Sequence, residues 1–187
     1  MLQVRLHGRG GQGVVTSAEL LAAAAFADGR HPQAFPSFGS ERSGAPVVAY
    51  CRIDDRPIRS HEPIAEPDVV VVQDPTLLHQ VPVFAGLRPR GTVLVNTGKT
   101  ASALGIAELP GLPRVVTVPA SQLGREHIGR PMPGPALLGV FAAVTGAIAL
   151  PALEAALRER FPGALGDANA AAARAAHDRE VASAAPA

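Results

Sequence analysis

Hydrophobic positions along the chain form two kinds of pattern, short runs rich in β-branched residues and longer stretches with helical spacing. The runs Leu2–His7, Val69–Val72, Thr92–Asn96 and Val115–Val118 predict strands. Valine fills every position of Val69–Val72, which is typical of a strand covered on both faces. Such strands alternate with helical patterns, so the sequence predicts an α/β fold of three layers with a mostly parallel central sheet.

Helical spacing follows the first strand and dominates the last third of the chain. Apolar residues recur every three to four positions over Val14–Ala27, and Gly29 is placed to end that helix. The first strand and this helix make a Rossmann-like βα unit. The C-terminal third is expected to be helical over Ser121–Ile128, Ala136–Leu150, Ala152–Arg160 and Asp167–Arg179. The tail at residues 181–187 is expected to fray.

One antiparallel hairpin is expected between the first helix and the valine strand. Val47–Ile53 reads as a strand, Asp54-Asp55-Arg56 as a turn, and Pro57–Arg59 as a short return segment. The preceding stretch, His31–Pro46, is rich in Pro, Gly, Ser and Phe and is expected to be a loop. Loops of that length in compact domains are usually functional or disordered.

Length and composition place the chain among ordinary globular proteins. Its 187 residues suit a single domain spanning 1–187, and the hydrophobic fraction is 47%. Seventeen basic and sixteen acidic side chains leave a net charge of +1, which gives no field to recruit nucleic acid. Cys51 is the only cysteine, so this chain alone cannot build an internal disulfide or a cysteine-ligated zinc or iron–sulfur site.

Targeting and metal signals are not evident in the sequence. The weakly polar stretch Pro135–Leu157 is broken by glycine, proline and glutamate, so it predicts buried helices rather than a membrane span. The start of the chain does not resemble a signal peptide, and a cytoplasmic protein is expected. The six histidines form no metal-binding pair, and no metal site is predicted.

The glycine-rich stretch after the first strand fits G-x-G-x-x-G and lies between a strand and a helix, as a phosphate-binding loop requires. Glycine lets the backbone approach a phosphate, and the free N–H groups of the helix N-terminus favour an anion. The alternative is a tight turn with nothing bound. Gln33 stands where NAD binding needs an acidic residue, which disfavours a nicotinamide cofactor. The candidate phosphate contacts are Gly8, Arg9, Gly10, Gly11, Gln12 and Gly13.

Two further segments are candidates for binding. Gly98-Lys99-Thr100 resembles the end of a P-loop, but Val93 stands where the first glycine belongs, so a kinase or ATPase is not predicted. The loop Ala34–Pro46 carries two phenylalanines among polar residues. It either folds back on the domain or forms a partner surface or cofactor clamp, with Phe35, Phe38, Glu41 and Arg42 as its contacts.

One resemblance rests on His7–Gly13, Ala34–Pro46, Glu66–Asp68, Val72–Leu78, Asn96-Thr97 and Leu153–Gly163. Through these segments the chain resembles the gamma subunit of 2-oxoacid:ferredoxin oxidoreductases, most of all the pyruvate:ferredoxin oxidoreductase (pyruvate synthase) branch. The similarity covers nearly the whole chain. One departure is Pro131–Leu138, which is richer in proline than the family's usual asparagine-containing helix entry.

The resemblance implies a subunit of an oxidoreductase that converts a 2-oxoacid, by default pyruvate, and coenzyme A to acyl-CoA, CO2 and reduced ferredoxin. Such a complex uses thiamine diphosphate, Mg2+ and [4Fe-4S] clusters. This sequence lacks the motifs for them, so they must come from alpha, beta and ferredoxin-like delta subunits. No catalytic residue and no activity are expected from this chain alone. Because ligands of open α/β sheets bind at the carboxyl edge, the glycine loop, with Arg9 and also Arg42 or Lys99, is expected to hold the phosphates of coenzyme A.

Other interpretations remain open at this stage. The complex could act on an aryl-2-oxoacid such as phenylglyoxylate and pass electrons to NAD through a flavin subunit. The chain could be a non-catalytic assembly module whose glycine loop binds no ligand. A stand-alone nucleotide-binding protein is the third alternative.

Overall fold

The computed structural model of the chain describes residues 1–37 and 44–184. Its centre is one sheet with the strand order β2-β3-β1-β4-β5-β6. Neighbouring strands among β1, β4, β5 and β6 are parallel, whereas β3 is antiparallel to both β1 and β2. The expected mostly parallel sheet with one antiparallel element is therefore confirmed. The strands are β1 (Leu2–Arg9), β2 (His31–Pro36), β3 (Pro46–Asp54), β4 (Val69–Val72), β5 (Thr92–Asn96) and β6 (Arg114–Val118).

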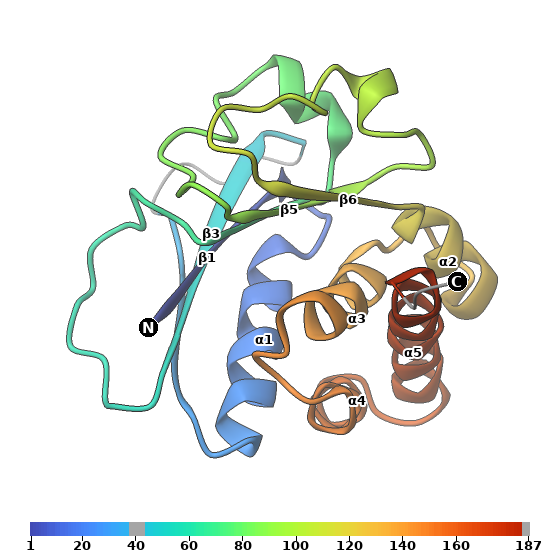
Figure 1. Cartoon of the computed structure of the whole chain (residues 1–187). Helices are drawn as coiled ribbons and strands as arrows, with labels where there is room; N and C mark the ends of the chain where they lie inside the picture. The colour runs from blue at the N-terminus through green and yellow to red at the C-terminus, as the bar shows by residue number, and fades with distance from the viewer. Residues whose placement is uncertain (38–43, 185–187) are drawn as a thin grey trace.

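The α-helices of the described residues lie on one side of the sheet (Figure 1). α1 and α3 contact the strands, and α4 and α5 pack behind them. This face of the sheet carries the larger hydrophobic core, which includes Leu6, Leu94 and Phe141, all fully buried. The helices are α1 (Val14–Ala27), α2 (Ala120–Ile128), α3 (Gly134–Thr145), α4 (Leu150–Arg160) and α5 (Ala164–Ala184).

The opposite face is covered by irregular chain and by two 3-10 helices, η1 (Pro75–His79) and η2 (Ser102–Leu104). A smaller core lies here, in which Val70 and Val72 pack with Leu77. Because Val69 and Val71 belong to the larger core, the valine strand is buried on both faces. This confirms the prediction made from its unbroken run of valines.

Arg5 of β1 holds the irregular layer against the sheet. Arg5 is 8% exposed, and its guanidinium donates to the carbonyl oxygens of Ile64 (3.3 Å), Val83 (3.0 Å) and Ala85 (2.6 Å). Its Nε–H donates to Nε2 of His7 at 3.1 Å. Burial lowers the pKa of Arg5 from its usual value. These bonds give the buried charge its partners and fix three loop positions far away in sequence.

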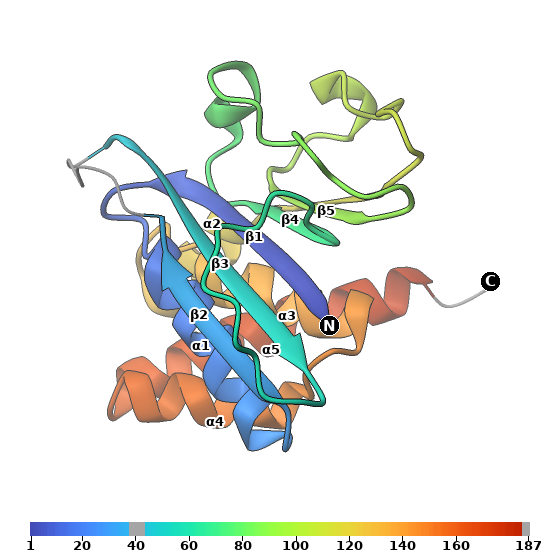
Figure 2. The same ribbon diagram turned by 90° about the vertical axis from the view of Figure 1, so that its left-hand side faces the viewer.

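Several sequence predictions need correction. The partner of β3 in the hairpin is β2, inside the stretch expected to be a loop, and Figure 2 shows the two strands side by side. Pro57–Arg59 is not a strand. The helix expected over Ala136–Leu150 ends at Thr145, because Gly146 adopts a left-handed conformation with φ 60°. Residues 181–184, assigned to a frayed tail, form the last turn of α5, and 185–187 lie outside the described residues.

Candidate functional site

The glycine loop joins β1 to α1 at the carboxyl edge of the parallel strands. Gly11 and Gly13 have φ values of 92° and 72°, which favour glycine strongly. At Gly8, an added Cβ would come within 2.5 Å of Cγ2 of Val14, so this glycine permits the close approach of strand and helix. At Gly11, by contrast, a Cβ would meet none of the described residues within 4 Å.

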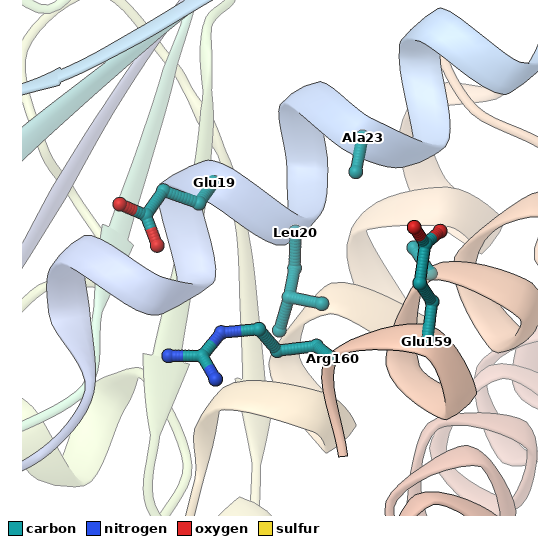
Figure 3. A pocket seen from close by; sticks show the side chains of 6 residues that line it. Glu19, Leu20, Ala23, Glu159 and Arg160 are labelled. Atoms are coloured by element: carbon teal, nitrogen blue, oxygen red, sulfur yellow. The ribbon is translucent and has the colours of Figure 1, made fainter. Parts of the chain in front are cut away.

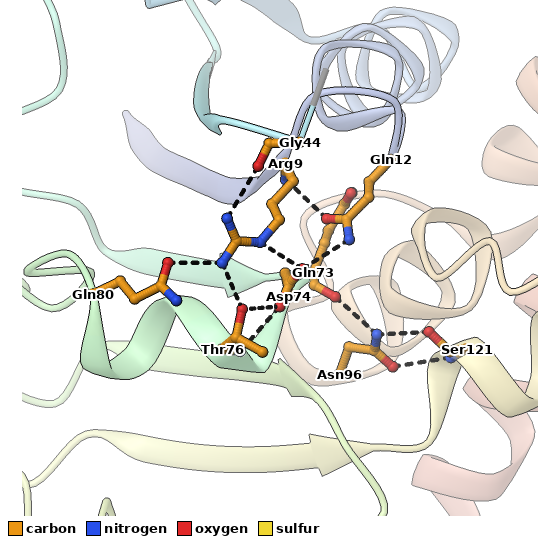
Figure 4. A network of polar contacts seen from close by, with 9 residues as sticks. All are labelled: Arg9, Gln12, Gly44, Gln73, Asp74, Thr76, Gln80, Asn96 and Ser121. Carbon is orange, nitrogen blue, oxygen red and sulfur yellow. Dashed lines mark hydrogen bonds and ion pairs between the residues drawn. The ribbon is translucent and has the colours of Figure 1, made fainter. Parts of the chain in front are cut away.

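The side chain of Arg9 does not point into open space but is bound within the chain (Figure 4). Its Nε donates to Oδ2 of Asp74 at 3.1 Å and forms an ion pair with it. Its terminal nitrogens donate to the carbonyl oxygen of Gly44 (3.0 Å), to Oγ1 of Thr76 (2.7 Å) and to Oε1 of Gln80 (2.7 Å). The guanidinium thus ties β1 to η1 and to the segment that leads into β3.

Asp74 is the acceptor at the centre of this network. Besides Arg9, it accepts hydrogen bonds from Nε2 of Gln12 (2.9 Å) and from the backbone N–H and hydroxyl of Thr76 (3.0 and 2.6 Å). Burial by itself would raise the pKa of this carboxyl group, but the hydrogen bonds from Thr76 and Gln12 and the charge of Arg9 outweigh it and lower the pKa. Gln12 also accepts from the backbone N–H of Arg9 at 2.8 Å, which closes the loop on itself.

A second polar cluster links the next strands at the same edge. Asn96 donates to the carbonyl oxygen of Gln73 and to Oγ of Ser121, both at 2.8 Å, and accepts from the backbone N–H of Ser121 at 2.9 Å. Gln73 is 1% exposed and donates to Oγ of Ser17 at 2.7 Å. These contacts link the end of β4 to β5, α1 and α2 at the carboxyl edge.

His7 lies one residue before the glycine loop, in contact with Arg5. It is 6% exposed, and burial, together with the nearby charge of Arg5, lowers its pKa to about 4. The imidazole is consequently neutral at physiological pH. Because its Nε2 accepts the Arg5 N–H, its proton resides on Nδ1.

The other predicted site residues are distributed as follows. Lys99 is exposed on the loop after β5, where its backbone N–H donates to Oγ1 of Thr97 at 3.1 Å. Phe35 is half-buried in β2; its ring lies 5.1 Å from that of Tyr50, and the guanidinium of Arg52 lies 5.3 Å above it. The remaining candidates lie outside the described residues, namely Phe38, Glu41 and Arg42.

A small cavity of about 110 Å³ lies against the glycine loop, where Gln12 and Gly13 line it together with Thr16 and Met132. Two larger cavities among the described residues border the neighbouring elements. One, of about 330 Å³, opens at the carboxyl ends of β5 and β6 and is lined by Pro75, Asn96, Thr97, Gly98, Pro119, Ser121, Gln122 and Arg125. The other, of about 320 Å³, lies between α1 and α4 (Figure 3). There Glu19, Leu20 and Ala23 face the end of α4. The second cavity contains none of the residues predicted for the site.

Sequence reasoning missed the partners of Arg9 and the cavity residue Arg125. Asp74 follows the valine strand and precedes a proline, a position typical of a capping residue, and it does cap η1. That local signal gives no hint that the same carboxylate binds Arg9. Within residues 1–37 and 44–184, no cluster of His, Cys, Asp or Glu is arranged to hold a metal ion. The described helices include none with the length and apolar character needed to cross a bilayer.

The fold and site define an α/β protein with a Rossmann-like first unit and a polar, hydrogen-bonded carboxyl edge. The family model for pyruvate ferredoxin/flavodoxin oxidoreductase matches residues 3–179. The chain therefore belongs to this family. It is a gamma-type subunit of a multi-subunit 2-oxoacid:ferredoxin oxidoreductase, as the similar proteins described next also indicate.

Pyruvate synthase subunit PorC of Methanothermobacter marburgensis is 46% identical over 179 residues, which are 96% of this chain and 97% of that protein. The gamma subunit common to the pyruvate and ketoisovalerate oxidoreductases of Pyrococcus furiosus is 48% identical over 180 residues, with 96% and 97% covered. The crystal structure of pyruvate oxidoreductase subunit PORC from Thermotoga maritima has a TM-score of 0.83 and 36% identity, and the match covers 95% of each chain.

The same fold also occurs inside a longer polypeptide. A 2-oxoglutarate:ferredoxin oxidoreductase from Magnetococcus marinus, solved with 2-oxoglutarate, coenzyme A and succinyl-CoA bound, matches with a TM-score of 0.79 at 18% identity. The match covers 100% of this chain and 32% of that chain. At this identity the likeness concerns the fold alone, which forms about a third of the larger protein.

Proposed function

We propose that the chain is the gamma subunit of a cytoplasmic complex that oxidatively decarboxylates pyruvate with coenzyme A and passes the electrons to ferredoxin. The names of the similar proteins support pyruvate as the substrate. Thiamine diphosphate, Mg2+ and [4Fe-4S] clusters belong to the alpha, beta and delta subunits in this proposal. The role of this chain in the proposal is to bind the partner subunits and to line the path by which coenzyme A reaches the thiamine site.

The glycine loop is the part of the chain that faces coenzyme A in this proposal. The observation that carries it is the geometry of strand, loop and helix: β1 delivers Gly8–Gly13 to the carboxyl edge, with the first turn of α1 behind the loop. Coenzyme A is the phosphate-bearing reactant, and it must reach the thiamine site. Lys99, on the same edge, adds a cation in this proposal. Arg42, the other cation expected from the sequence, lies outside the described residues.

The sequence predicts that Arg9 contacts a phosphate, but in this proposal Arg9 has a different role. Because its guanidinium is already bound to Asp74, Thr76, Gln80 and Gly44, we assign it the support of the loop. The backbone N–H groups of Arg9, Gly10 and Gln12 are also bound within the chain, which leaves those of Gly11 and Gly13 to face the phosphates in this proposal. A substitution of Arg9 would thus change the loop as well as any contact with the ligand. A clean test needs a residue at which charge can be altered without disturbing the network.

Gly11 offers such a test. Asn and Asp tolerate positive φ better than other residues, and among the described residues a side chain at this position meets open space. The matched variants Gly11→Asn and Gly11→Asp differ only in one negative charge. At roughly 7 Å from a phosphate, that charge costs about 0.6 kcal/mol in water and about 2.4 kcal/mol at an effective dielectric constant near 20.

In the assembled enzyme we therefore expect Gly11→Asp to have an apparent KM for coenzyme A about threefold to fiftyfold above that of Gly11→Asn. The KM for pyruvate should be the same in both variants. If the apparent KM for coenzyme A is equal in the two variants, the loop does not lie near the phosphates, and the assembly-module interpretation is favoured.

The assembly-module interpretation has a specific observation in its favour. The charged groups of the Arg9–Asp74 network make their contacts within the chain, as those of a purely structural loop would.

The aryl-2-oxoacid alternative differs from the proposed function in the substrate and in the electron acceptor. The purified native complex decides it when pyruvate and phenylglyoxylate are compared, each with ferredoxin and with NAD as acceptor.

A further inference from the structure

The last strand of the sheet, β6, has a neighbour on one side only. It stands at the end of the strand order and pairs with β5 (Figure 1). The backbone N–H of Arg114 and the carbonyl oxygen of Val118 bond to the residues just before and just after β5, so both point toward that strand. Because successive residues of a strand direct their N–H and C=O groups to opposite sides, those of Val115 and Thr117 point outward. No other described segment pairs with them.

The exposure of β6 comes from this outer edge. Val115 packs against the smaller core and Val116 against the larger one, so both faces of the strand are covered. Val115, Val116 and Thr117 nevertheless remain partly exposed, whereas β4 is buried throughout. The edge also lacks the usual protection against pairing, since β6 contains no proline and only its first residue, Arg114, is charged. An edge of this kind is a template for a strand from another chain.

The residue that precedes this edge by two positions, Leu112, combines backbone strain with an exposed side chain. Its φ of 51° is a left-handed value that is unfavourable for a leucine. Pro113 follows, and a residue before proline ordinarily adopts an extended backbone. The side chain is 85% exposed, so no burial within the chain offsets the strain. Strain that the fold itself does not use is typical of a functional contact.

A second strained residue, Arg90, lies beside this loop, just before β5. Its φ is 59°, and its backbone N–H donates to the carbonyl oxygen of Gly111 at 2.8 Å. The exposed arginines Arg88 and Arg114 form ion pairs within the chain. By contrast, no carboxylate in the described part of the chain pairs with Arg90. A molecule that covers this edge would therefore meet an apolar side chain next to an unpaired cation.

We propose that the outer edge of β6, together with Leu112 and Arg90, is a docking surface for an extended segment of a partner subunit. The segment adds a strand to the sheet through the backbone groups of Val115 and Thr117. It presents an apolar hollow to Leu112 and a carboxylate to Arg90. The identity of the occupant rests on the proposed function, in which this chain binds partner subunits. Leu112 and Arg90 precede the parallel strands, so they lie at the opposite edge of the sheet from the glycine loop.

The first test removes an outward backbone donor. Thr117→Pro deletes the N–H that pairs with nothing in the described chain, and proline is tolerated on the free side of an edge strand. Thr117→Val is the matched control, because it keeps the N–H in a side chain of similar shape. Each purified variant competes with isotope-labelled wild-type chain for the partner subunits, and mass spectrometry of the assembled complex gives the relative Kd. We expect Thr117→Pro to raise the Kd about tenfold or more and Thr117→Val to change it less than about twofold.

The second test changes the loop before the strand and does not depend on how the chain tolerates proline. Asparagine adopts a left-handed backbone more readily than leucine, so Leu112→Asn should leave the Tm of the isolated chain unchanged or raise it. The Kd for the partner subunits should nevertheless rise about tenfold to hundredfold, because a buried apolar contact is lost. Leu165→Asn is the control, since Leu165 is 49% exposed and lies in the first turn of α5. It should change the Kd less than about twofold.

The matched pair Arg90→Asn and Arg90→Asp tests the charge of the partner. Both variants tolerate the left-handed backbone, and a carboxylate on the partner would make Arg90→Asp bind about threefold to thirtyfold more weakly than Arg90→Asn. Equal binding by this pair would remove the carboxylate from the proposal and so overturn it as stated.

Wild-type binding by both Thr117→Pro and Leu112→Asn would overturn the docking surface, while assembly of the wild-type chain in the same assay would leave the proposed function standing. If the wild-type chain itself did not join the partner subunits, the proposed function would fail as well. If the variants lost only self-association of the isolated chain in sedimentation velocity, the occupant would be a second copy and the proposal would be wrong.

Discussion

Replacing Asp74 by asparagine tests whether the network at the carboxyl edge stabilises the fold. The substitution keeps the size of the side chain but removes its charge, and it presents an amide where Arg9 and Gln12 need an acceptor. The side chains of Asp74 and Arg9 are 12% and 23% exposed, so solvent screens their ion pair only in part. A hydrogen bond to a charged group contributes about 1.5–3 kcal/mol.

We expect Asp74→Asn to lower the free energy of unfolding by about 1.5–3 kcal/mol at pH 7. The loss is limited to this range because the amide oxygen can still accept a hydrogen bond from Thr76. For a chain of this length that loss lowers the Tm by about 3–12 °C. Asp55→Asn is the matched control. The Asp55 side chain is 79% exposed, and its loss should change stability by less than about 0.5 kcal/mol.

The pH dependence gives a second, independent readout. The pKa of Asp74 is lower in the folded chain than its usual value, so the carboxylate stabilises the fold at neutral pH, and this contribution is lost as the pH falls through the lowered pKa. The difference in the free energy of unfolding between wild type and Asp74→Asn should be largest at pH 7 and should shrink below a pH of about 4. Urea unfolding of the isolated chain at several pH values measures it. A difference near zero at pH 7, or one that is as large in acid, would refute this reasoning.

Three other predictions concern packing, assembly and activity. Gly139→Ala should destabilise the chain by about 1–3 kcal/mol in thermal unfolding, since the added Cβ would overlap the carbonyl oxygen of Ala173 where α3 crosses α5; an unchanged Tm would contradict the close crossing. Phe35→Ala should weaken binding to the partner subunits in size-exclusion titrations more than it lowers the Tm of the isolated chain, and the reverse result would make the ring ordinary core. The isolated chain with added thiamine diphosphate should release no CO2 from pyruvate, and turnover would overturn its assignment as a subunit without catalytic residues.

The sequence predicts best the elements that bury a continuous apolar surface. The valine run gives β4 its observed bounds, and the apolar spacing of Val14–Ala27 gives those of α1. The strand β2 escapes detection because Pro32 and Pro36 lie within His31–Pro36 and no alternation marks it. Such prolines are tolerated because β2 is the edge strand of the sheet, a position that only the fold reveals.

Less of the candidate site than of the fold could be predicted from the sequence. The glycine pattern correctly places the loop between β1 and α1, because that information is local. The partner of Arg9 lies 65 positions away in sequence, so no spacing rule relates the two residues. The sequence therefore indicates a free cation for a phosphate, whereas the fold binds it to Asp74. Arg125 was missed for a similar reason, since its cavity exists only where β5, β6 and α2 meet.

The buried guanidinium of Arg5 has a consequence for the order in which the chain folds. Its carbonyl partners lie 59 to 80 positions further along the chain, so these bonds close long loops. Closing such loops costs entropy that is recovered only after the strands between them have paired. We therefore expect the irregular layer to form once β1 has paired with β4, because that pairing joins Val4 to Val69 and so already closes most of the same loop.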